Sequence, residues 1–179
     1  ESAVETVLSH FKEAGFRGTM LQVSHAFHSH LMDPMLEDFR QALDGIVFSE
    51  PKLTVISNVS GKKAGPEIRT SEYWVSHIRN AVLFGDGIRT AMEEGATSFI
   101  EVGPDPILSE LGRQSLSEVT GLHWAHSLRR KRDDAATFLR GLCQAHGGGA
   151  EVNWPALFAG VKGAAIRLPT YAYQRQRYW

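Results

Sequence analysis

Cysteine, net charge and long apolar runs are all scarce in this chain of 179 residues. Its one cysteine, Cys143, cannot form an internal disulfide and suits a reducing compartment, so we expect a cytoplasmic protein. The 19 Lys and Arg residues nearly cancel the 20 Asp and Glu residues, which leaves no overall field to attract nucleic acid or an anionic membrane. No apolar run approaches the roughly 20 residues that span a bilayer. The length suits one domain with its own core, or part of a larger domain.

The chain opens at Glu1 without a Met or a signal peptide, inside a segment with helical spacing, which suggests a cut rather than a natural start. Residues 2–14 predict a helix that Gly15 ends, and residues 19–23 predict a short strand. A helix and a strand of this size cannot bury their apolar faces alone. We therefore expect them to need partners from outside this sequence.

Strand and helix patterns then alternate, which favours an α/β fold with a mostly parallel sheet. Asp33 and Pro34 predict the cap and the first position of a helix whose apolar stripe runs to Val47. Asp105 and Pro106 predict a second helix start of the same kind. The other expected elements are a buried strand at 53–56, a turn at 58–61, a loop at 62–70, helices at 71–78 and 81–94, strands at 97–102 and 122–128, a helix at 133–146 and a short helical turn at 154–158.

Three histidines fall between a predicted strand and a predicted helix, in the stretch Val23-Ser24-His25-Ala26-Phe27-His28-Ser29-His30. Loops at such junctions expose reactive groups in α/β enzymes, and histidine takes up and returns protons near neutral pH. A metal site is one hypothesis, but these histidines converge only through a tight turn and no second cluster supplies a further ligand. One histidine as the base of a nucleophile–histidine pair is another. The third is a set of partly buried, hydrogen-bonded histidines.

The sequence His25-Ala26-Phe27-His28 resembles the HAFH motif of acyltransferase domains in modular polyketide synthases. Further stretches resemble the same family in the same order, at residues 56–61, 73–84, 99–104 and 168–179. Together these motifs cover essentially the whole chain. The last of them is similar to the linker that follows these acyltransferase domains.

The resemblance implies the C-terminal part of an α/β-hydrolase-like large subdomain, of the malonyl-CoA:carrier-protein transacylase type, with half of a ferredoxin-like small subdomain. Residues 1–24 would be the remnant of the small subdomain, and residues 25–147 would belong to the large one. Residues 148–179, which start in a run of three glycines, would form the linker. The aromatic residues of this linker would pack back over the domain and a neighbouring ketosynthase linker.

The family's reaction passes an acyl group from coenzyme A to a serine, and then to the phosphopantetheine thiol of an acyl carrier protein. The resemblance assigns the role of general base to His28, and implies no bound cofactor or metal. The sequence contains no Gly-x-Ser-x-Gly stretch. We therefore expect the serine, the arginine that clamps the extender carboxylate and the oxyanion loop to lie outside this sequence, and the chain alone to be inactive.

His25 and Phe27 are candidate selectivity residues, because the resemblance associates His-Ala-Phe-His with malonyl and Tyr-Ala-Ser-His with methylmalonyl. Phe27 would fill the space that an α-methyl group needs, and one methyl group is worth only about 1–3 kcal/mol. Ordinary core packing is the alternative for Phe27. His77 or Asn80 is expected to support His28, since in related transacylases a main-chain carbonyl from the matching loop orients the base.

Two readings of the whole chain follow. The first is part of a malonyl-CoA:carrier-protein acyltransferase, with the N-terminal half of that domain, a ketosynthase with its linker and an acyl carrier protein as partners. The parent synthase would be a homodimer. The second is a non-catalytic scaffold that keeps the fold and wraps adjacent domains. Residues 129–132 are basic but precede two aspartates, so a solvated loop is favoured over a nucleic-acid site.

Overall fold

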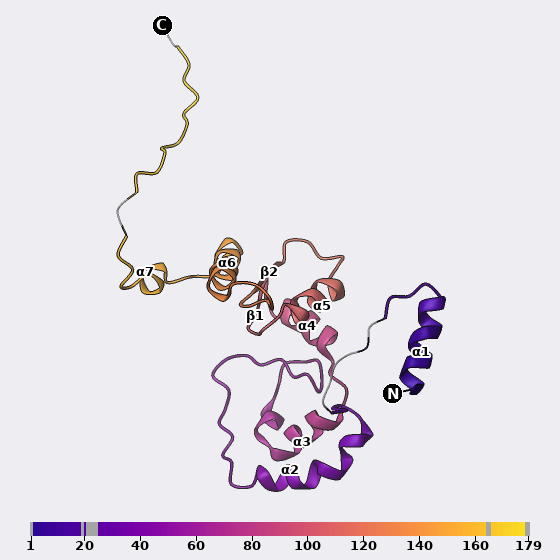
Figure 1. Ribbon diagram of the computed structural model, residues 1–179. Helices are drawn as coiled ribbons and strands as arrows, with labels where there is room; N and C mark the ends of the chain where they lie inside the picture. Colours follow the sequence, from indigo (N-terminus) through magenta and orange to yellow (C-terminus); the bar gives the residue numbers. More distant parts are fainter. Residues whose placement is uncertain (1, 19, 21–24, 164–165, 178–179) are drawn as a thin grey trace.

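The computed structural model describes residues 2–18, 20, 25–163 and 166–177. Figure 1 shows helices joined by loops, one small sheet and an extended C-terminal tail. In chain order the elements are α1 (Ser2–Glu13), the 3₁₀ helix η1 (His30–Met35), α2 (Leu36–Ala42), the 3₁₀ helix η2 (Pro66–Arg69), α3 (Ser71–Arg79), α4 (Phe84–Glu93), β1 (Ser98–Glu101), α5 (Ile107–Ser115), β2 (His123–His126), α6 (Asp134–Gly147) and α7 (Trp154–Leu157).

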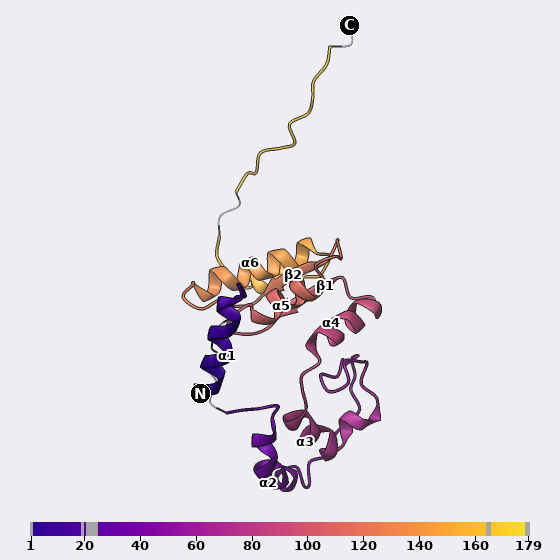
Figure 2. The ribbon, with the colours of Figure 1, turned by 90° about the vertical axis from the view of Figure 1, so that its right-hand side faces the viewer.

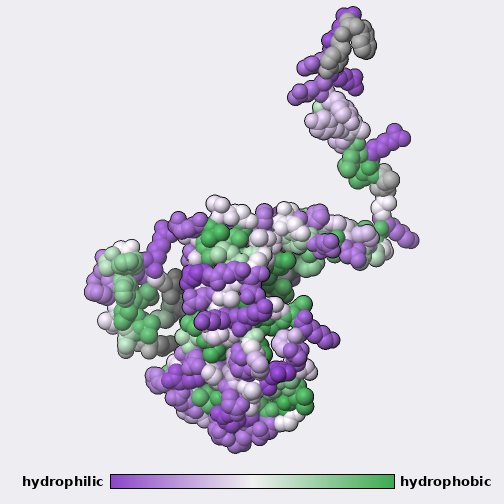
Figure 3. Space-filling model, turned by 180° about the vertical axis from the view of Figure 1, so that it is seen from behind, coloured by the Kyte–Doolittle hydropathy of each residue, from purple (hydrophilic) through white to green (hydrophobic). Residues whose placement is uncertain are grey.

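Helix α1 stands apart from the rest of the chain (Figure 1). The predicted helix is confirmed, and Gly15 follows it with a φ of +85°, a conformation that glycine adopts without strain. Among the described residues α1 contacts no other helix or strand. Its apolar side chains, including Val4, Val7 and Phe11, are therefore exposed, and Figure 3 shows this hydrophobic surface. The predicted strand at 19–23 lies outside the described residues, apart from Met20.

The segment before α2 corrects the prediction for Asp33. Ser29, not Asp33, is the cap, because its Oγ accepts a hydrogen bond from the backbone N–H of Leu31 at 3.2 Å. Asp33 lies inside η1 and forms an ion pair with Arg79 at the end of α3. Helix α2 also ends before the predicted limit, and Val47 is 89% exposed. An aspartate before a proline is typical of a helix cap. In the structure, however, the Asp33 carboxylate pairs with Arg79, which lies far along the chain.

The predicted buried strand at 53–56 is wrong. Leu53 is 82% exposed, and of the described residues in this stretch Ile56 alone forms a β-bridge, an antiparallel one with Lys63. A strand needs a neighbouring strand along its length, and the described chain offers this segment only the short return of its own turn. Ser57 anchors that turn, since its hydroxyl is buried and lies 2.8 Å from the hydroxyl of Tyr73 on α3.

Helices α2 and α3 pack together below the sheet in Figure 1. The predicted helix at 71–78 is confirmed as α3, and Thr70 caps it by accepting a hydrogen bond from the backbone N–H of Tyr73 at 3.3 Å. Met32, Tyr73 and Val75 are buried in this unit. A predicted helix from residue 81 is also confirmed, although α4 begins three residues later, at Phe84.

Strands β1 and β2 form a parallel pair, as predicted from the stretches 97–102 and 122–128, although each strand is shorter. Phe99 pairs with Trp124 across the sheet, and their rings stack with centroids 4.4 Å apart. Helix α6 lies along the sheet in Figure 2, and the prediction of this helix from residue 133 is confirmed. Gly141 permits the close approach, because a Cβ there would lie 2.2 Å from the carbonyl oxygen of His126.

The start of α5 differs from the predicted cap at Asp105. The Asp105 carboxylate is turned toward Arg130 and accepts a hydrogen bond from its backbone N–H at 3.0 Å. Glu101, at the end of β1, takes the place of a cap: its two carboxylate oxygens accept hydrogen bonds from the backbone N–H groups of Leu108 and Ser109, at 3.0 and 2.8 Å. Burial raises the pKa of Glu101, but these donors lower it more, so it lies below its ordinary value.

After α7 the described residues contain no further helix or strand, and residues 166–177 run away from the domain (Figure 1). The expectation that their aromatic side chains pack back on the domain is wrong, since Tyr171 and Tyr173 are 76% and 74% exposed. According to the resemblance, these side chains would also cover a neighbouring ketosynthase linker. That linker is not part of this sequence. None of the described helices is both long enough and apolar enough to cross a bilayer.

Candidate active site

His28 lies in the turn between residue 25 and η1, in a backbone conformation that is uncommon for residues other than glycine. Its φ is +63°, in the left-handed region, which for a residue with a side chain costs roughly 1–2 kcal/mol. Ser29 fixes the turn from within, because its hydroxyl donates to the carbonyl oxygen of Ala26 at 2.7 Å. The surrounding structure must supply the contacts that keep His28 in this conformation.

The end of α3 supplies two of those contacts. The backbone N–H of His28 donates to the carbonyl oxygen of Ile78 at 2.9 Å. The ring nitrogen Nδ1 of His28 lies 2.8 Å from the carbonyl oxygen of Asn80. Since a carbonyl oxygen can only accept, Nδ1 must carry the hydrogen of this bond. In the neutral ring Nε2 then has a free lone pair, the state that a general base needs.

Asn80 places its carbonyl oxygen because it ends α3. Its backbone N–H bonds to the carbonyl oxygen of Ser76 at 2.9 Å, and its φ and ψ of −82° and 159° turn the chain away from the helix. The amide side chain turns back toward the helix and donates from Nδ2 to Oγ of Ser76 at 2.6 Å. The contact with His28 therefore uses the backbone of Asn80, and the side chain fixes the corner from which that backbone leaves the helix.

Aromatic rings surround His28 on the α3 side and along its own turn. The rings of His28 and His77 meet edge to face with centroids 5.9 Å apart, and the Phe27 ring lies 6.3 Å from His28. His25 and Phe27 are also in ring contact, at 6.1 Å. Phe27 is 52% exposed in the part of the chain that the structure describes. The five predicted site residues thus lie in one place, although they come from two stretches of sequence about 50 residues apart.

His77 and Asn80 contact His28 in different ways. Asn80 accepts a hydrogen bond from the His28 ring, whereas His77 makes ring contacts with His28, Tyr73 and Trp74. A main-chain carbonyl holds the His28 ring, as the resemblance leads one to expect. The role of His28 as the general base stays a prediction.

Sequence reasoning missed one pair at this site, Asp33 and Arg79. Arg79 comes directly between Ile78 and Asn80, the two residues whose carbonyl oxygens hold His28. An acid and a base 46 positions apart carry no pairing signal in a single sequence. In the part of the chain that the structure describes, no group of three or more His, Cys, Asp or Glu side chains converges in a way that could hold a metal ion.

Comparison with known proteins identifies the family. The family model for the acyl transferase domain matches residues 1–152. Polyketide synthase GfsA of Streptomyces halstedii is 41% identical over 181 residues, and phenolphthiocerol synthesis polyketide synthase Pks15/1 of Mycobacterium bovis is 40% identical over 179 residues. Both alignments cover 100% of this chain, but only 2% and 8% of the lengths of those synthases.

Solved structures agree with this assignment. The acyltransferase domain from the second module of the salinomycin polyketide synthase is 37% identical with a TM-score of 0.79, over 97% of this chain and 40% of that one. Malonyl-CoA:acyl carrier protein transacylase from Clostridium perfringens is 26% identical with a TM-score of 0.63, over 81% of this chain and 44% of that one. The chain belongs to the acyl transferase domain family and, within it, to the acyltransferase domains of polyketide synthases.

Proposed function

We propose that this chain carries the general base and the selectivity residues of an acyltransferase that moves a malonyl unit from coenzyme A to an acyl carrier protein. The observation that carries the proposal is the hydrogen bond between Nδ1 of His28 and the carbonyl oxygen of Asn80. It fixes the ring in one neutral tautomer and leaves Nε2 as the basic atom on an exposed side chain.

The reaction takes place in two halves, and Nε2 of His28 serves both. A serine hydroxyl gives its proton to Nε2 while its oxygen attacks the thioester carbon of malonyl-CoA. The C–S bond then breaks, and the departing coenzyme A thiolate takes the proton back. In the second half the phosphopantetheine thiol gives its proton to Nε2 and its sulfur attacks the acyl-serine ester. The C–O bond breaks, and the serine oxygen recovers the proton.

The serine belongs to the part of the domain outside these 179 residues, because the sequence has no Gly-x-Ser-x-Gly stretch. The same part supplies the donors that stabilise the tetrahedral intermediate and the arginine that binds the malonyl carboxylate. The spans of about 40% that the chain occupies in the solved acyltransferase structures support this division. Exposed apolar side chains on α1 support it too, since they lack a cover within the described residues.

Phe27 and His25 set the preference for malonyl. The Phe27 ring lies beside the His28 ring and half of its surface is open, so its bulk borders the place where the acyl group must sit to react. A methyl branch on the extender would compete with that ring for space. The expected preference is modest, because one methyl group is worth about 1–3 kcal/mol.

The domain boundaries follow the same proposal. Residues 1–24 belong to the small ferredoxin-like subdomain, 25–147 to the large subdomain and 148–179 to the linker after the acyltransferase. The ketosynthase with its linker and the acyl carrier protein are the partner domains, in a homodimeric synthase. That the matched relatives are multidomain polyketide synthases supports these partners.

Acyl loading measured by intact mass tests the function. The complete acyltransferase domain that contains this chain is incubated with malonyl-CoA and with methylmalonyl-CoA separately, beside a His28→Ala variant. We expect malonyl loading of the wild-type domain, weaker methylmalonyl loading and a collapse of both in the variant. Equal loading of His28→Ala would contradict the mechanism. No loading of the wild-type domain by either thioester would favour the non-catalytic scaffold.

A further inference from the structure

Three consecutive residues at the end of α3 hold the segment that contains His28. Ile78 accepts a hydrogen bond from the His28 backbone, and Asn80 accepts one from the His28 ring. Between them, Arg79 extends its side chain to Asp33 in η1, five positions after His28. The two carbonyl oxygens hold the turn itself, and the ion pair holds the short helix into which the turn continues.

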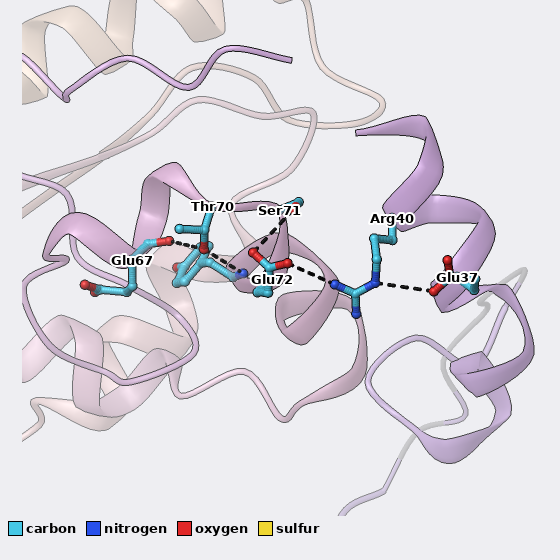
Figure 4. Close-up of polar contacts among 7 residues, drawn as sticks. Glu37, Arg40, Glu67, Thr70, Ser71 and Glu72 are labelled. Carbon is cyan, nitrogen blue, oxygen red and sulfur yellow. Dashed lines mark hydrogen bonds and ion pairs between the residues drawn. The ribbon is translucent and has the colours of Figure 1, made fainter. Parts of the chain in front are cut away.

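A second ion pair joins the same region to α3 but lies at the other end of that helix. Arg40 of α2 pairs with Glu72 in the first turn of α3 at 3.1 Å, and also with Glu37 at 3.4 Å (Figure 4). The two arginines are equally exposed, at 39% of the side-chain surface. The two pairs therefore provide a matched comparison, because both join η1 or α2 to α3 and only one lies beside His28.

We propose that Asp33 and Arg79 are positioning residues for His28. This inference rests on the proposed role of His28 as the base. His28 is kept in a left-handed conformation that persists only where surrounding contacts determine it. The two hydrogen bonds to the carbonyl oxygens of Ile78 and Asn80 lie on one side of the turn and still let it pivot about that edge. The Arg79–Asp33 pair fixes a second point, on η1, and so holds Nε2 in the direction of the serine.

Because the Arg79–Asp33 pair is exposed, its effect should be measured on the reaction rate and not on stability. An exposed ion pair contributes little to stability, so removing it should leave the fold intact. The direction of a catalytic ring is more sensitive, because a displacement of about 1 Å can cost roughly 100-fold in rate. The pair should therefore matter for the rate of acyl transfer and hardly at all for the melting temperature.

The test uses the complete acyltransferase domain and rapid-quench measurement of acyl-serine formation from malonyl-CoA. We expect Arg79→Gln and Asp33→Asn each to lower the maximal rate roughly 10- to 100-fold with KM unchanged. The double variant should lose no more than either single variant, because the residues act as one unit. Asp33→Glu, which keeps the charge, should restore most of the rate. Arg40→Gln and Glu72→Gln, the matched controls, should stay within about twofold of wild type.

Each outcome has a distinct meaning. If His28→Ala loads at the wild-type rate, the proposed function fails and this inference with it. If His28→Ala collapses while Arg79→Gln and Asp33→Asn load normally, the positioning role alone is overturned. Equal losses in Arg79→Gln and Arg40→Gln would also overturn it, because the effect would then be general to the helix. If Arg79→Gln does not fold, Asp33→Asn and Asp33→Glu decide between these outcomes.

Discussion

Hydrogen bonds and an ion pair hold each end of α3, but the two ends contact different parts of the chain. At the first turn, Thr70 caps the helix and Arg40 pairs with Glu72, and all of these contacts stay within the helical unit (Figure 4). At the last turn, the carbonyl oxygens of Ile78 and Asn80 accept hydrogen bonds from the backbone N–H and the ring of His28. If His28 is the base, as proposed, this short helix is a structural element at its N-terminus and a support for the catalytic base at its C-terminus.

The largest expected effect is at the C-terminal end. His28→Ala should slow acyl-serine formation about 10²- to 10⁴-fold, because a positioned base contributes that much to proton transfer. Discharge of a pre-loaded acyl-serine to the carrier protein should slow by a similar factor, since the same nitrogen serves both halves. Rapid-quench kinetics of each half measure the two factors. A variant slowed in loading alone would contradict a single base for both.

Phe27→Ser should change the choice of substrate and leave the chemistry unchanged. Removing the ring opens space beside His28, so methylmalonyl loading should rise relative to malonyl by roughly 10- to 200-fold. A competition between the two thioesters, followed by intact mass, gives the ratio directly. If the ratio stays at its wild-type value, Phe27 does not border the acyl group. His30→Ser is a suitable control, since His30 belongs to the same stretch and has no assigned role.

Thr70→Ala addresses the N-terminal end of α3. Loss of the cap should lower the free energy of unfolding by about 1 kcal/mol, because the backbone N–H of Tyr73 loses its acceptor. The acylation rate at a temperature where the domain is folded should not change. Thermal unfolding and loading kinetics on the same sample separate the two effects. If Thr70→Ala lowered the acylation rate without lowering stability, the N-terminal end of α3 would not differ from the C-terminal end in its role.

Helix α5 extends the comparison to an N-terminus held by a carboxylate. Because the folded state lowers the pKa of Glu101, its stabilising effect is present above the unfolded pKa and is lost as pH falls through the folded one. Glu101→Gln should therefore destabilise the domain near neutral pH and have a vanishing effect at strongly acid pH. Urea unfolding at several pH values tests this. A difference between variant and wild type that is constant with pH would contradict it.

The sequence predicted most helices, the parallel strand pair and the identity of the residues around His28, because these depend on local patterns and a family resemblance. It misassigned Asp33 and Asp105 as caps. Both carboxylates are instead occupied by arginines far along the chain, Arg79 and Arg130, and such pairing is decided by tertiary structure.

Two other features left no usable signal in the sequence. The stretch 53–56 has the composition of a strand but lacks a strand to pair with in the described chain, so it stays largely exposed. The carbonyl oxygen of Asn80 belongs to the backbone, and every residue has one. Only the end of α3, and the turn of the chain that follows it, show why this carbonyl oxygen reaches His28.

The tautomer of His28 is the most direct measurement of the central claim. In the complete acyltransferase domain, the ¹⁵N chemical shifts of the His28 ring, assigned with the His28→Ala variant, report which nitrogen carries the hydrogen of the neutral ring. The account predicts hydrogen on Nδ1 and an unprotonated Nε2. A neutral ring with hydrogen on Nε2 would contradict it, because the contact with Asn80 would then be absent and Nε2 could not accept a proton.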